Sequence, residues 1–217
     1  MPQELDPSTR AFEAQLSPSE RQLLSGLDSP AKVQAFLNTI PYSEDKFYRC
    51  PLRLMRDRKG HCFDGALFAA LALRRLGYPP LILELIPNER DDDHLLALFK
   101  GNGCWGAVAQ SNFTGLRYRE PVYRNLRELV MSYFEDFYNA AGERTLRGYR
   151  GPVHLQTFDH LDWMSSDSGL DRLADGMDRY RVHPVISAAM ADALTLADER
   201  SLQAALLGAN PEGLFKL

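Results

Sequence analysis

The sequence contains few cysteines and no long apolar run. Its three cysteines, Cys50, Cys62 and Cys104, are an odd set among 217 residues and too few for a disulfide framework. This scarcity favours a reducing, cytoplasmic setting. No apolar run approaches the roughly 20 residues of a membrane-spanning helix, so we expect no integral membrane protein. The first residues, Met1 to Asp6, also lack the basic start and apolar stretch typical of a secretory signal.

Positive charge is scarce overall but concentrated in one stretch. The formal net charge is −4, which argues against nucleic acid as the main partner. Between residues 46 and 59, however, only Asp57 opposes a group of six cations. One interpretation is a solvated basic face, and the other is a group of charges that favours a thiolate at Cys62. The six cations are Lys46, Arg49, Arg53, Arg56, Arg58 and Lys59.

A buried helix is predicted at about residues 62–76. Cys62 follows Gly60 and opens a run that is almost entirely apolar through Leu73, and Arg74 and Gly77 are typical of a helix end. Cys62 then lies in the first turn, where unpaired backbone N–H groups and the positive end of the helix dipole favour a thiolate. This position makes Cys62 a candidate nucleophile.

The remaining pattern predicts an α+β fold, with an antiparallel sheet against which the Cys62 helix packs. The composition, 45% hydrophobic and 25% charged, is that of a globular protein with one large domain or one domain and an extension. Helices are predicted within 1–28, at 30–40, 125–139, 168–177 and 187–207, with a helical turn near 52–56. Strands are predicted at 81–86, 94–99, 104–110 and 117–122, with a tight turn at 101–103 and a loop at 148–162.

A thiol nucleophile needs a base, and His94 is the best candidate by position because it opens a buried strand after the helix. The register of the following hairpin offers two choices for a third, orienting group. If Lys100 pairs with Cys104, His94 lies opposite Gln110 with Asn112 diagonal to it. If Gly101 pairs with Cys104, His94 lies opposite Ser111.

The pattern resembles the transglutaminase-like superfamily of papain-like folds. The residues that carry the resemblance are Gly60-His61-Cys62 at a helix start, His94, and the strand from Trp105 to Asn112. It covers roughly residues 41–140, with Tyr118 to Pro121 similar to a bacterial branch. It implies a core at 41–140 between an N-terminal helical segment at 1–40 and a C-terminal helical extension at 141–217.

The resemblance implies thiol-based chemistry on amides, with Cys62 as nucleophile and His94 as base. For the third residue we select Asn112, by analogy with the asparagine of papain-like enzymes. One departure concerns that third position, where the superfamily commonly has Asp, often as Asp-Pro-Thr. This chain has Ala109-Gln110-Ser111-Asn112 instead.

Two functional hypotheses follow. The first is a cysteine-dependent amide hydrolase or acyl transferase that needs no cofactor and acts on a peptide or protein. The second is a catalytically inactive module that binds peptides or proteins in the same cleft. A zinc site built from Cys50, Cys62, His94 and Cys104 is a third alternative, although these residues lack the close spacing typical of structural zinc sites. We expect no nucleic-acid or membrane partner.

Overall fold

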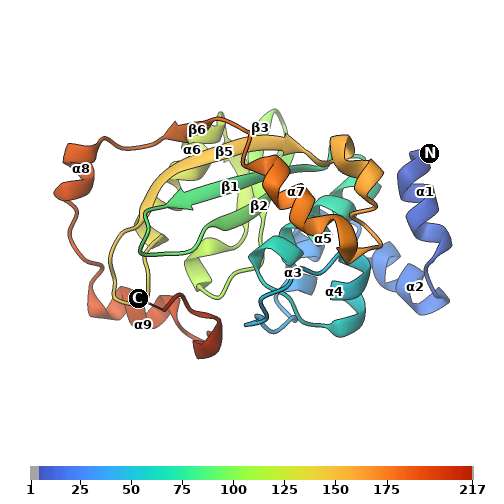
Figure 1. Ribbon diagram of the computed structural model, residues 1–217, viewed down its shortest axis with the longest axis horizontal. Coiled ribbons are helices and arrows are strands. Elements are labelled where there is room, and N and C mark those ends of the chain that lie inside the picture. The colour runs from blue at the N-terminus through green and yellow to red at the C-terminus, as the bar shows by residue number, and fades with distance from the viewer. Residues whose placement is uncertain (1–4, 217) are drawn as a thin grey trace.

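The computed structural model describes residues 5–216; residues 1–4, at the start of the expected N-terminal segment, lie outside that range. Its helices and strands form one mixed α and β arrangement (Figure 1). The α-helices are α1 (Pro7–Ala14), α2 (Pro18–Gly26), α3 (Pro30–Leu37), α4 (Pro51–Asp57), α5 (Cys62–Arg75), α6 (Leu126–Met131), α7 (Leu170–Met177), α8 (Ala188–Asp192) and α9 (Glu199–Ala205). The strands are β1 (Leu81–Pro87), β2 (His94–Gly101), β3 (Cys104–Val108), β4 (Arg119–Tyr123), β5 (Leu146–His154) and β6 (Val182–Pro184).

The first three helices each begin at a residue whose side chain caps the helix. Asp6, Ser17 and Ser29 are their N-caps, and each is followed by a proline whose fixed φ suits the first helical position. Ser17 and Glu20 form a reciprocal capping box. These local hydrogen bonds explain why short helices with little apolar surface of their own form here.

Helix α5 is the buried centre of the fold, as predicted. Every residue from Cys62 to Arg74 is buried, and the helix packs mainly on β2, with α3 and α4 beside it. Gly65 permits the close approach to the end of β3, because a Cβ atom there would lie 2.2 Å from Cβ of Gln110. The close packing fixes the position of Cys62 relative to the sheet.

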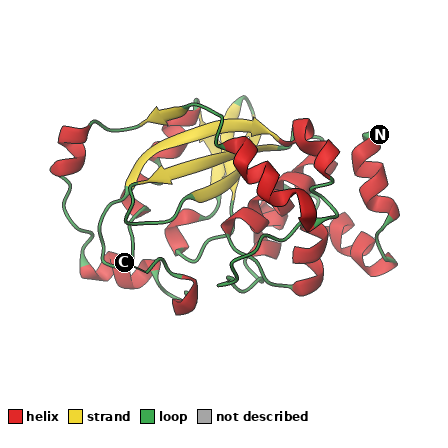
Figure 2. Ribbon diagram, in the orientation of Figure 1, coloured by secondary structure: helices red, strands yellow, loops and turns green. Residues whose placement is uncertain are grey.

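The sheet has six strands in the order β4-β3-β2-β1-β5-β6, and every neighbouring pair is antiparallel (Figure 2). The β2–β3 hairpin turns at Asn102 and Gly103, which both have positive φ, as a two-residue hairpin turn requires. Gly101 therefore pairs with Cys104, which selects the second of the two registers considered above.

The two faces of the sheet carry separate hydrophobic clusters. Leu95, Ala97 and Phe99 of β2 belong to the cluster around α5. Leu96 and Leu98 belong to a second cluster with α6 on the opposite face. Because side chains alternate along a strand, these memberships also determine where His94 points.

Three sequence expectations about the second half of the chain are wrong. Residues 146–154, expected within a C-terminal helical extension and in part as a loop, form β5, which pairs with β1 along its length. The expected helix at 125–139 ends at Met131, where the Ser132 hydroxyl donates a hydrogen bond to the Leu129 carbonyl. The expected helix at 187–207 is split into α8 and α9.

The sheet therefore continues beyond residue 140, although the division of the chain at residues 40 and 140 stays a prediction. Within residues 5–216, no helix is long and apolar enough to cross a membrane.

Candidate functional site: a cleft beside Cys62

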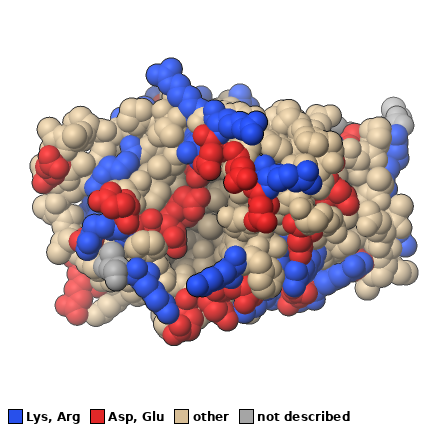
Figure 3. All heavy atoms as spheres, viewed as in Figure 1, with Lys and Arg blue, Asp and Glu red and all other residues tan. Residues whose placement is uncertain are grey.

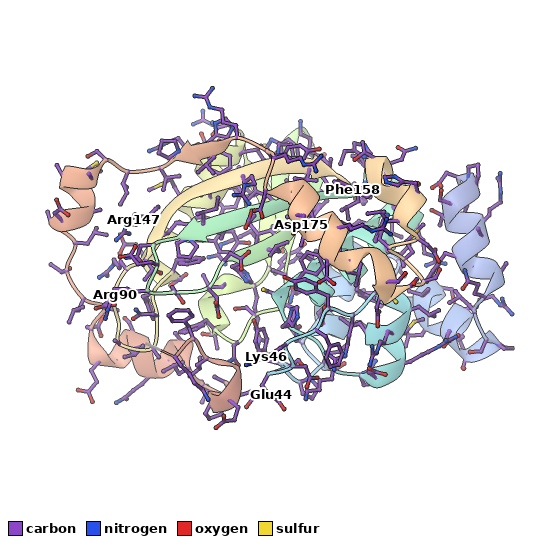
Figure 4. The ribbon with its side chains drawn as sticks, viewed as in Figure 1. Glu44, Lys46, Arg90, Arg147, Phe158 and Asp175 are labelled. Carbon is purple, nitrogen blue, oxygen red and sulfur yellow. The ribbon has the colours of Figure 1, made fainter. Side chains whose placement is uncertain are left out.

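A cavity of about 650 Å³ opens beside the start of α5. Four segments line it: the loop at 42–48, the first residues of α5, residues 92–95 at the start of β2, and residues 212–216. Figure 4 shows Glu44 and Lys46 of the first segment close to the ribbon of the last residues of the chain. Segments distant in sequence thus meet around Cys62.

Cys62 is the first residue of α5, and 9% of its surface is exposed. Its Sγ lies 3.8 Å from the carbonyl oxygen of Asp93 and also contacts the Tyr42 hydroxyl. Burial, followed by the negative charge of Asp93, raises the pKa of the Cys62 thiol to about 12. The expectation that the helix start favours a thiolate is not met, because the thiol is held in its neutral form.

Asp64 is a second buried acidic group near Cys62, in the first turn of α5. Its carboxylate accepts hydrogen bonds from the backbone N–H groups of Arg49 (2.7 Å) and His61 (3.2 Å). Burial raises the pKa of Asp64 to about 7, against the lowering effect of these donors and of Arg49. The first turn of α5 therefore already contains its own acidic group.

Four of the six cations of the basic stretch form ion pairs, while Lys46, Arg56 and Arg58 are exposed, and none of the six acts on the pKa of Cys62 as strongly as burial and Asp93 do. Arg49 pairs with Asp45, Asp57 and Asp64. The other ion pairs of the stretch are Arg53 with Asp57 and Asp167, Arg56 with Glu20, and Lys59 with Glu44 and Asp45. Acidic and basic side chains are accordingly interspersed on the surface (Figure 3). These pairs connect α4 to neighbouring segments.

His94 opens β2, as predicted, but its side chain lies on the sheet face opposite α5. It pairs with Leu85 in the ladder, and Leu85 belongs to the second hydrophobic cluster. Its Nε2 lies 2.7 Å from the carbonyl oxygen of Leu116, and burial lowers its pKa to about 4. Asp93 and Leu95, the residues on either side of His94, line the Cys62 cleft instead.

The three candidates for the third position have separate roles. Gln110 packs against Gly65, and its Nε2 donates to the Ile40 carbonyl. The Ser111 hydroxyl accepts a hydrogen bond from the backbone N–H of Phe113. Asn112 binds the backbone of Asn210 through both atoms of its side-chain amide, at 2.7 and 2.8 Å.

The structure therefore does not join the proposed catalytic residues. Among the hydrogen bonds of residues 5–216, none links Cys62, His94 and Asn112 to one another. Their catalytic roles stay a prediction. What the structure does join is Cys62 with Tyr42 and Asp93 in the cleft, and Asn112 with Asn210 outside the lining of the cleft.

Sequence reasoning missed residues 210–216, which we call the strap. Residues 212–216 of the strap form one wall of the Cys62 cleft, and residues 213–215 also border a smaller cavity of about 50 Å³ beside His94, which Asn112 lines as well. Its contact with Asn112 spans 98 positions in the sequence. Nothing in the local pattern of Asn210-Pro211 signals so distant a partner.

The residues of the zinc alternative do not come together. In the part of the chain that the structure describes, no group of three or more His, Cys, Asp or Glu side chains is placed to hold a metal ion. Cys50 and Cys62 are buried free thiols, and Cys104 is half-buried beside the hairpin turn.

A scan against protein-family models and a search of curated proteins both give no match. Among solved structures, LapG of Legionella pneumophila is similar over 51% of this chain and 75% of that chain, with 15% identity and a TM-score of 0.35. Calcium-bound LapG is similar over 48% and 70%, with 16% identity and a TM-score of 0.34. A Cytophaga hutchinsonii protein provisionally assigned as a cysteine protease is similar over 53% and 47%, with 17% identity and a TM-score of 0.33.

Proposed function

We propose that this chain binds an extended peptide along the edge of the Cys62 cleft, where the strap lies, as a recognition module. The observation that supports the proposal most directly is the pairing of Asn112 with the strap. The Asn112 amide accepts from the backbone N–H of Asn210 and donates to the carbonyl of the same residue. A side-chain amide that satisfies both backbone groups of one residue recognises peptide backbone irrespective of its sequence.

The surroundings of Cys62 support recognition over thiol catalysis. A nucleophilic cysteine needs an adjacent base or a lowered pKa. Here the nearest titratable neighbour at the start of β2 is Asp93, whose charge acts against ionisation of the thiol. His94 is directed to the other face of the sheet and is bound to Leu116. The thiol then serves as part of the floor of the cleft.

A phage-displayed random peptide library, selected on the full chain, tests this proposal. We expect peptides to be enriched on the wild type and on Gln203→Ala, and to be lost on Asn112→Ala. Gln203 is a suitable control because it is exposed on α9 and its side chain bonds only to Glu199 in the described structure. No enrichment on the wild type, or equal enrichment on Asn112→Ala, would contradict a peptide site at this cleft.

A cysteine-dependent amidase or acyl transferase is the second candidate, favoured by the position of Cys62 at a helix start that borders a cleft. Incubation of the selected peptides with the wild type and with Cys62→Ala distinguishes the two. Recognition alone predicts intact peptides in both samples by mass spectrometry. Cleavage or amide exchange that depends on Cys62 would establish the enzyme in its place.

A further inference from the structure

The strap is held at the edge of the cleft by the Asn210 side chain as well as by its backbone. The Asn210 side chain donates from Nδ2 to the Tyr42 carbonyl (3.0 Å) and to the Glu44 carboxylate (3.1 Å). Its Oδ1 accepts from the backbone N–H of Glu212 (3.2 Å). Both ends of the amide are satisfied, so alanine at this position would lose all three contacts and aspartate would lose the two that Nδ2 donates.

A glycine follows at the point where the strap comes closest to the cleft wall. A Cβ atom on Gly213 would lie 2.9 Å from Cδ1 of Tyr42 and 3.3 Å from the carbonyl oxygen of Ser43. The first distance is shorter than ordinary van der Waals contact, and the second atom belongs to the backbone and cannot easily move. A larger residue at this position therefore requires the wall or the strap to shift.

Two apolar residues come next and lie between the two cavities. Leu214 and Phe215 are half-buried, and each borders both the Cys62 cleft and the small cavity beside His94. The small cavity also contains Leu116, Phe137 and Tyr138. The aromatic and aliphatic surroundings favour apolar side chains at these two positions.

We infer that the strap lies where an outside ligand binds, along the edge of the Cys62 cleft, and that the ligand contains asparagine, then glycine three residues later, then two apolar residues. This inference rests on the proposed function, because it names the class of peptide that the cleft accepts. A ligand with these features competes with the strap for Asn112, Tyr42 and Glu44. The strap is tethered, so its effective concentration is high, and an outside peptide must displace it.

The test uses a fluorescent peptide with the sequence of residues 208–216 and the full-length chain. On Asn210→Ala, which loosens the strap and leaves Asn112 intact, we expect the peptide to bind about tenfold or more tightly than on the wild type. Peptides with alanine in place of Asn210 or Gly213 should bind at least about tenfold more weakly than the parent peptide. Gln203→Ala should behave as the wild type.

Hydrogen exchange gives a second measurement that does not depend on the Asn210 variant. Saturating peptide should increase exchange at the amides of Asn210 and of residues 212–216 in the wild type, because the strap leaves its place at the edge of the cleft. Unchanged exchange, or equal peptide affinity in the wild type and Asn210→Ala, would show that the peptide and the strap do not compete for one site.

Failure of this inference can be distinguished from failure of the proposed function. If Asn112-dependent peptides are selected from the library but alanine at the asparagine or glycine position does not weaken the strap peptide, the motif is wrong and the peptide site stands. If neither the library peptides nor the strap peptide bind in an Asn112-dependent manner, both are wrong.

Discussion

Cys62 shows how neighbouring residues determine the chemistry of a side chain whose position is otherwise favourable. A helix start favours a thiolate, but the effect is modest and applies to a group that water can reach. At Cys62 burial removes most of that water, and Asp93 adds a negative charge nearby. Desolvation and like charge therefore outweigh the helix dipole, and the pKa moves upward.

This balance predicts the alkylation behaviour of Cys62. In a background with Cys50→Ala and Cys104→Ala, iodoacetamide should label Cys62 slowly at neutral pH, with an apparent pKa well above the roughly 8.5 of free cysteine. Asp93→Asn removes the opposing charge and should lower that pKa by about one unit or more. His94→Ala should leave it unchanged.

Asp192→Asn is the matched control for Asp93→Asn, because Asp192 is exposed at the end of α8. A labelling pKa below 8.5 that rises in His94→Ala would instead demonstrate a coupled thiol–imidazole pair.

The position of Cys62 could be predicted from the sequence, but the orientation of His94 could not. The glycine before Cys62, the long apolar run and the basic residues with Gly77 after it define the helix. The stretch from His94 to Phe99, by contrast, is apolar on both faces, so no alternation indicates which residues point toward the helix. A shift of one residue along the strand decides whether His94 or its neighbours Asp93 and Leu95 face the cleft, and in the structure the neighbours do.

At the scale of single elements, Gly65 determines how closely α5 approaches the end of β3. In Gly65→Ala the new Cβ atom would overlap Cβ of Gln110, which is the rigid base of that side chain. Overpacking of this kind costs about 1–3 kcal/mol. The gain of about 1 kcal/mol in helix propensity does not offset a displacement of the helix.

We therefore expect Gly65→Ala to lower the free energy of unfolding in urea by about 1–2 kcal/mol. Gly26→Ala is the matched control, because no atom lies within 4 Å of a Cβ at that position, and it should be neutral or slightly stabilising. A stabilised Gly65→Ala variant would mean that the helix and β3 are more loosely packed than the structure indicates.

Strand β5 illustrates which elements escape local prediction. Gly148, Gly151 and Pro152 lie within it, and such residues are depleted in strands. Pairing with β1 on one side and β6 on the other forms the strand despite its composition. Bulges in the register near Ile82 and Ile86 accommodate the irregular residues. Hairpin β2–β3 needed no such distant partner, because its turn residues determine its register locally.

At the scale of the whole molecule, Arg74 connects three distant segments. Its guanidinium is almost fully buried and forms hydrogen bonds with Asp6 before α1 and with Asp159 after β5, at 2.7 to 2.8 Å. A buried arginine with two carboxylate partners joins the N-terminal helices and the C-terminal half to α5. The connection depends on the ionisation of both acids.

The same connection predicts a loss of stability in acid. Burial raises the pKa of Asp6, but hydrogen bonds from Thr9 and Arg74 outweigh it and bring the value to about 2. Because this folded-state pKa lies below the unfolded value of about 3.9, the stabilisation is complete above pH 4 and is lost as the pH falls toward 2. Asp159 shifts in the same direction, chiefly through Arg74 against its own burial.

Urea unfolding between pH 7 and pH 2 measures this contribution. Asp6→Asn should lower the free energy of unfolding by about 1 kcal/mol at pH 7, a modest value because Asp6 is partly exposed. The difference between this variant and the wild type should shrink as the pH falls toward 2. Asp28→Asn, which removes an exposed pair with Lys32, should change little at either pH. A loss of stability for Asp6→Asn that is equal at pH 7 and pH 2 would contradict this prediction, because the ionisation of Asp6 would then contribute nothing.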